Sequence, residues 1–63
     1  MTCKIGDRVL FTFLGERLKG VVTAKEGATA KIRGDDGYNY SSIYINEPKS
    51  KKDKPLGIIL EKL

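Results

Sequence analysis

The sequence contains no histidine and no tryptophan, and Cys3 is the only cysteine among its 63 residues. Without histidine, the Ser-His-Asp and Cys-His arrangements that activate a nucleophile are not available. A single thiol forms no intramolecular disulfide, and it does not supply the roughly four nitrogen or sulfur ligands of a zinc site. We therefore expect a protein that is not an enzyme, with no catalytic residues, no metal and no cofactor.

Long apolar stretches are also missing. No run approaches the ~20 residues that cross a bilayer, and residues 1–7 contain no apolar segment of the kind found in secretion signals. A lone cysteine is typical of a reducing compartment. These features predict a cytoplasmic protein without a membrane partner. Because Cys3 is close to a chain end that we expect to fray, its thiol is predicted to have no special role.

Charge is plentiful but unevenly distributed, with a net charge of +4. Residues 1–48 carry seven basic and six acidic side chains, whereas residues 49–63 carry five and two. Much of the excess lies in a predicted flexible, lysine-rich loop over residues 46–56, where phosphate groups or an acidic partner would be contacted. The lysines of this loop are Lys49, Lys51, Lys52 and Lys54. A nearly neutral body with one basic loop is only a weak indication of nucleic-acid binding.

Short segments with alternating apolar and polar residues lie between glycine- and proline-containing turns, which is typical of a small β-barrel or sandwich. The predicted strands cover residues 8–14, 18–25, 28–33, 38–45 and 57–62. We expect residues 1–63 to form a single all-β domain, a five-stranded antiparallel barrel, with Ile59 and Leu63 at the barrel ends. The predicted core consists of Val9, Phe11, Phe13, Val22, Ala30, Ile32, Ile43, Ile45, Ile58 and Leu60.

The three tyrosines fall on one segment, residues 38–45. Side chains of a strand alternate between its two faces, so Tyr38, Tyr40 and Tyr44 lie outside if Ile43 and Ile45 face the core. This register predicts an exposed ladder of tyrosines. A bulge that shifts the register would instead place one or two of them over the open end of the barrel.

Lys31 and Arg33, on the outer face of the neighbouring predicted strand, would flank the tyrosines. Tyrosine is enriched at protein interfaces, so we predict a protein-binding module whose partner is another protein or a second copy of the chain. Aromatic rings interleaved with basic groups also hold RNA or single-stranded DNA, by stacking and phosphate contacts. Nucleic-acid binding is therefore the alternative function.

Four short motifs resemble SH3-like barrels of the KOW and Tudor type, and the resemblance extends over residues 6–45. The motifs are Gly6-Asp7-Arg8-Val9, Gly20-Val21-Val22, Ala30-Lys31-Ile32-Arg33 and Asp35-Asp36-Gly37. The resemblance implies a strongly bent five-stranded SH3-like barrel. It also implies binding functions, because Tudor members use an aromatic cage and KOW members contact RNA or ribosomal proteins.

The Gly-Asp-Arg-Val opening is also similar to that of the plasmid-encoded, trimethoprim-resistant dihydrofolate reductases, which are SH3-like chains of similar length. Their pore carries a Val-Gln-Ile-Tyr segment, and the matching stretch here is Ser41-Ser42-Ile43-Tyr44, with Ser42 in place of the glutamine. An oligomeric reductase is thus a remote alternative. It requires a symmetric assembly in which Ile43 and Tyr44 line a shared pore.

Overall fold

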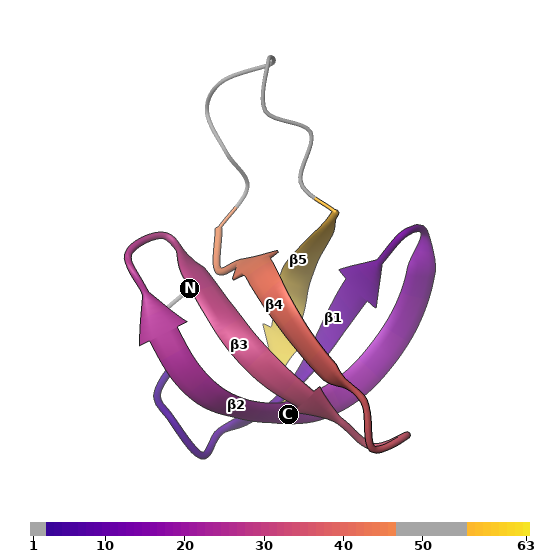
Figure 1. Ribbon diagram of the computed structural model, residues 1–63, viewed down its shortest axis with the longest axis horizontal. Helices are drawn as coiled ribbons and strands as arrows, with labels where there is room; N and C mark the ends of the chain where they lie inside the picture. Colours follow the sequence, from indigo (N-terminus) through magenta and orange to yellow (C-terminus); the bar gives the residue numbers. More distant parts are fainter. Residues whose placement is uncertain (1–2, 47–55) are drawn as a thin grey trace.

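A computed structural model describes residues 3–46 and 56–63, and these residues form one closed five-stranded barrel in the order β1-β2-β3-β4-β5 (Figure 1). The strands are β1 (Arg8–Phe13), β2 (Glu16–Glu26), β3 (Thr29–Gly34), β4 (Asn39–Tyr44) and β5 (Gly57–Lys62). The predicted all-β class and five-stranded barrel are confirmed. In this part of the chain, no helix is long and apolar enough to cross a membrane.

Strand β2 is the longest strand, and it curves from its contact with β1 around to its contact with β3 (Figure 1). Neighbouring strands are antiparallel, including β1 with β5, except where β4 meets β5. There the pairing is parallel and consists of Tyr44 opposite Ile58, so the barrel closes through one short parallel contact. The predicted flexible loop between these strands falls largely on residues 47–55, outside the described residues.

The core is formed by nine buried side chains from the N-terminal segment and all five strands. They are Cys3, Val9, Phe11, Val22, Ala30, Ile32, Ile43, Ile45 and Ile59. Seven of these were predicted from the alternation of apolar residues. Phe13, also predicted, is partly buried and packs against this cluster together with Leu18 and Tyr40.

The prediction for β5 is wrong in its register. Ile59 is buried, whereas Ile58 is half-buried and Leu60 is exposed. The cause is the pairing with β1, which places Ile59 opposite the buried Phe11, and cross-strand partners point to the same face. Leu63 is also exposed and does not fill a barrel end. Because apolar residues occupy both faces of β5, alternation alone does not identify its inner face.

Cys3 is fully buried, so the prediction of a thiol on a frayed segment is wrong. Hydrogen bonds attach the chain before β1 to the barrel. The Gly6 amide donates to the Val22 carbonyl at 2.8 Å, and the Val22 amide donates to the Asp7 carbonyl at 3.0 Å. The Asp7 side chain also accepts a bond from the Lys4 amide at 2.9 Å. These bonds hold Cys3 against the core at one end of the barrel.

Replacement of Ile32 by alanine tests the core. We expect Ile32→Ala to lower the free energy of unfolding by about 2–5 kcal/mol, because it removes a fully buried side chain from a close-packed interior. Ile5→Ala is the matched control, since Ile5 is 65% exposed and its truncation should change stability by less than about 0.5 kcal/mol. Denaturant titration measures both changes in the free energy of unfolding. Equal changes for the two variants would contradict the placement of Ile32 in the core.

The burial of Cys3 predicts slow reaction with a thiol reagent under native conditions and fast reaction in denaturant, because a buried thiol is reached only when the segment opens. The time course of labelling, followed by mass spectrometry, measures this protection. Equal labelling rates in the two conditions would show that the segment before β1 is not attached to the barrel.

Candidate functional site

The three tyrosines do not form the predicted ladder. Tyr38 is 70% exposed, but Tyr40 is half-buried and packs against the core. Tyr44 is half-buried beside the β4–β5 contact. The prediction of an outward Tyr40 is therefore wrong, and Tyr38 and Tyr40 lie at a different part of the surface from Tyr44.

A bulge in β4 accounts for this change. The pairing with β3 steps from Ile32 opposite Tyr40 to Ala30 opposite Ile43, so β3 contributes one residue between these pairs and β4 contributes two. Ser42, in the bulge, has a φ of 58°, a left-handed conformation that is uncommon for residues other than glycine. The additional residue shifts the alternation by one position. As a result, both Tyr40 and Ile43 point inward.

Because its side chain points inward, Tyr40 contacts two other aromatic rings. Its ring meets that of Phe13 at 5.0 Å with an interplanar angle of 60°, and that of Phe11 at 5.2 Å with an angle of 62°. Edge-to-face pairs of this kind contribute ~0.5–1.5 kcal/mol beyond the area that they bury. Tyr40 thus links the core, through Phe11, to the end of the barrel where Phe13 lies.

Asp36 holds the two tyrosines in place. The Tyr40 hydroxyl donates to Oδ2 of Asp36 at 2.7 Å, and the backbone amide of Tyr38 donates to Oδ1 at 3.0 Å. These bonds, that from the Tyr40 hydroxyl above all, lower the pKa of Asp36 below its ordinary value. The same hydroxyl bond, with burial and the negative charges of Asp36 and Glu16, raises the pKa of Tyr40 to about 12.

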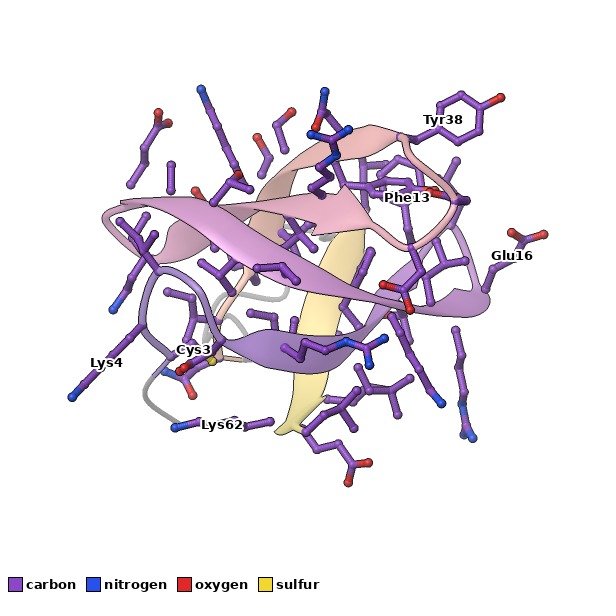
Figure 2. All side chains as sticks on the ribbon, turned by 90° about the horizontal axis from the view of Figure 1, so that it is seen from below. Cys3, Lys4, Phe13, Glu16, Tyr38 and Lys62 are labelled. Atoms are coloured by element: carbon purple, nitrogen blue, oxygen red, sulfur yellow. The ribbon has the colours of Figure 1, made fainter. Side chains whose placement is uncertain are left out.

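Figure 2 shows Phe13, Glu16 and Tyr38 at one end of the molecule, with Cys3, Lys4 and Lys62 toward the other. In Figure 1 the β1–β2 and β3–β4 turns lie at separate corners of this side of the barrel, and the contact between the Phe13 and Tyr40 rings links the two corners. We call this surface the aromatic end. It consists of Phe13, Glu16, Asp36, Tyr38 and Tyr40.

The aromatic end combines the negative faces of aromatic rings with two carboxylates. Both features attract a cationic group, since a ring within about 6 Å of a cation contributes ~0.5–2 kcal/mol, depending on how far the pair is removed from water. The carboxylates of Glu16 and Asp36 would repel a phosphate. The electrostatics of this end therefore favour a positively charged ligand.

The predicted basic residues Lys31 and Arg33 lie on the outer face of β3, with Arg33 at the end of the strand next to the β3–β4 turn. Arg33 is opposite Asn39, and Tyr44 is opposite Thr29, so both side chains are on the face turned away from the core. Lys31 is exposed on the same face. The predicted site is thereby divided into the aromatic end and this outer face. The predicted contacts at Lys49, Lys51, Lys52 and Lys54 lie outside the described residues.

Sequence reasoning did not assign Phe13, Glu16 or Asp36 to the site. Phe13 was expected in the core, and Glu16 and Asp36 have the character of ordinary turn residues. In a meander of antiparallel strands, the first and third turns lie on the same side of the sheet. The contact of Phe13 with Tyr40 also needs the bulge in β4, which turns Tyr40 inward.

Among residues 3–46 and 56–63, no three acidic or cysteine side chains are close enough together to hold a metal ion. The reductase alternative requires Ile43 at a pore surface, but Ile43 is fully buried in the core. This placement gives that alternative no support.

Comparisons of the chain with protein-family models, with curated proteins and with solved structures gave no match.

The bond between Tyr40 and Asp36 predicts the order in which the tyrosines ionise. With its pKa raised to about 12, Tyr40 should be the last of the three tyrosines in an alkaline titration followed by tyrosinate absorbance. Tyr40→Phe should remove this last phase, and Tyr44→Phe should retain it. A last phase that persists in Tyr40→Phe would contradict the assignment.

The raised pKa of Tyr40 also makes the free energy of unfolding depend on pH. A tyrosine with a raised pKa in the folded state stabilises the fold fully below its unfolded-state pKa of about 10, and that contribution is lost as the pH rises toward 12. The native protein should therefore lose more stability than Tyr40→Phe over this range.

Proposed function

We propose that this protein is a small binding module that recognises a protein partner through its aromatic end, where a lysine or arginine side chain of the partner contacts the rings. The observation that carries the proposal is Tyr38. This aromatic residue is 70% exposed, and its backbone is bound to a carboxylate of the same surface. Exposed aromatic residues beside polar groups are typical of interaction sites.

The rigidity of this surface supports the proposal. Asp36 and Tyr40 are held by hydrogen bonds, and Tyr40 also packs against Phe11 and Phe13. A surface that is already ordered loses little side-chain freedom when a partner binds, so more of the contact energy contributes to affinity. The partner's side chain would lie beside Tyr38, near the negative charge of Asp36, which accepts a hydrogen bond from the Tyr38 amide.

The resemblance of residues 6–45 to SH3-like barrels of the Tudor type agrees with this proposal, because members of that group use an aromatic cage. The proposed contact differs from the expected tyrosine and basic face in the sign of its charge. Lys31 and Arg33 were expected to flank the tyrosines and to meet a second copy or a partner with an acidic or apolar patch, whereas the aromatic end would take a basic side chain. The function expected from the sequence and the function proposed here are both the binding of a protein rather than catalysis.

Nucleic-acid binding is the second candidate, and the outer face of β3 and β4 favours it. Lys31, Arg33 and Tyr44 share that face, which provides cations beside one aromatic ring. Glu26 reduces the contribution of Lys31, because the Lys31 ammonium lies 3.4 Å from its carboxylate. If single-stranded nucleic acid binds at this face, the logarithm of the binding constant should fall with the logarithm of the salt concentration, with a slope of about 0.7 for each phosphate neutralised.

The proposal is tested with two short peptides that differ at one central position, lysine in one and glutamine in the other. We expect the lysine peptide to shift the amide resonances of Tyr38 and Asp36, and Tyr38→Ala to weaken its binding roughly tenfold, the loss of ~1.4 kcal/mol of cation–ring attraction. Tyr44→Ala is the matched control, and it should leave the affinity unchanged.

Two results would contradict the proposed site. Equal binding of the two peptides would show that the positive charge is not recognised. Resonance shifts confined to Lys31, Arg33 and Tyr44 on addition of a single-stranded oligonucleotide, with no response at Tyr38 to either peptide, would favour nucleic-acid binding instead. Circular dichroism of each variant confirms that the barrel is retained.

A further inference from the structure

Exposed apolar side chains gather along the ribbon that β1 and β5 form on one side of the barrel. Four of the six large apolar residues exposed among residues 3–46 and 56–63 lie along this ribbon, and they are between 40% and 67% exposed. They are Leu14, Leu56, Leu60 and Leu63. The Leu14 amide donates to the Leu56 carbonyl at 2.8 Å, and the Leu63 amide donates to the Arg8 carbonyl at 2.8 Å, so both ends of the ribbon are joined.

The outer face of the ribbon is apolar between these ends as well. Leu10 lies between two buried residues, Val9 and Phe11, so its side chain points outward, where it is half-buried. Ile58 precedes the buried Ile59 and points outward for the same reason. Contact with water along such a face is unfavourable by ~25 cal/mol for each Å² of apolar surface, so covering it would be stabilising.

Charged residues border this apolar face in a definite order. Leu10 on β1 pairs with Glu61 on β5 and with Lys19 on β2. Cross-strand partners point to the same side of a sheet, so an acid, a leucine and a base form one row across three strands. At ~4.8 Å between strands, the two charged residues are about 10 Å apart. Within the described part of the chain, neither forms an ion pair.

We infer that this face is the contact surface of a symmetric dimer with a second copy of the chain. A two-fold axis parallel to β1 and passing beside Leu10 reverses the row across the strands. Glu61 of each copy then lies over Lys19 of the other, and the two Leu10 side chains meet between them. Two sheets pack face to face at ~10 Å with their strands roughly aligned, which is the geometry that this arrangement requires.

The order of the charges identifies a second copy as the occupant. Across the strands the row has the order acid, apolar, base, and its complement has the order base, apolar, acid. A two-fold rotation of the same face produces that reversed order, so a second copy is complementary to the first. Arg8, the one basic residue of β1, forms an ion pair with Asp35. A chain of 63 residues has a small core, and association of subunits is a common source of added stability at this size.

The row contains none of the residues of the aromatic end, although the Lys19 carbonyl accepts a hydrogen bond from the amide of Asp35, the residue before Asp36, at 2.9 Å. The dimer therefore does not depend on the proposed recognition of a cationic partner. Failure of either proposal leaves the other standing.

Sedimentation equilibrium over a range of concentrations, with charge-reversed variants, tests the dimer. We expect a monomer–dimer equilibrium for the native chain, and a dissociation constant raised roughly tenfold by Lys19→Glu and by Glu61→Lys. Each change replaces two attractive contacts of ~0.2–1 kcal/mol with two repulsive ones. The double variant Lys19→Glu/Glu61→Lys restores the opposite charges and should recover the native dissociation constant.

Lys25→Glu is the matched control for Lys19→Glu, because it makes the same change of net charge at an exposed position of β2 away from the row. It should leave the dissociation constant within about twofold of the native value. A chain that remains monomeric at high micromolar concentration would overturn the proposal. So would a dimer in which the double variant behaves no better than the single ones. Circular dichroism establishes that every variant is folded.

Discussion

The bulge in β4 is the feature on which the surface chemistry of this barrel depends. It adds one residue to β4 opposite β3, and Ser42 within it has a left-handed backbone. Because side chains on either side of a bulge lose their simple alternation, Tyr40 and Ile43 both face the core. Tyr40 then packs against Phe11 and Phe13, and its hydroxyl group meets Asp36. A regular strand would have placed Tyr40 outside, with no such contacts.

This arrangement separates charge of opposite sign over a small molecule. Glu16 and Asp36 lie at the aromatic end, whereas Lys31 and Arg33 are on the outer face of β3. A nearly neutral total for residues 1–48 thus conceals local regions of opposite sign. Since the field near a surface depends on the nearest charges, each region would attract ligand groups of a different charge. The net charge of the chain predicts neither partner.

Much of the core followed from alternation and turn positions. Val9 and Phe11 on β1, and Ala30 and Ile32 on β3, are buried as their patterns predicted. Arg8 and Thr12 mark the outer face of β1 although Leu10 lies between them, and the outer face of β3 is polar. The same rule was wrong for β5. Its run of Ile58, Ile59 and Leu60 is apolar on both faces, and the pairing with β1 decides which side is inside.

The candidate site was predicted in part. Tyr38 was expected to be exposed and is exposed, but Tyr40 has a different environment, and Phe13 and Asp36 were not assigned to the site. Cys3 shows a similar limit, because hydrogen bonds between the segment before β1 and distant Val22 lie outside any local pattern. Contacts between residues far apart in the chain are set by strand register, and a bulge of one residue changes that register.

By itself, the sequence determined the fold class, the number of strands and the inner faces of β1 and β3, because polar and apolar residues alternate there with a period of two between glycine-containing turns. Only the tertiary structure decided the inner faces of β4 and β5 and the pairing of Tyr40 with Asp36. The physical reason is that these depend on how strands pair across the barrel. Backbone hydrogen bonding and packing of the whole core select one register among several that the local sequence permits.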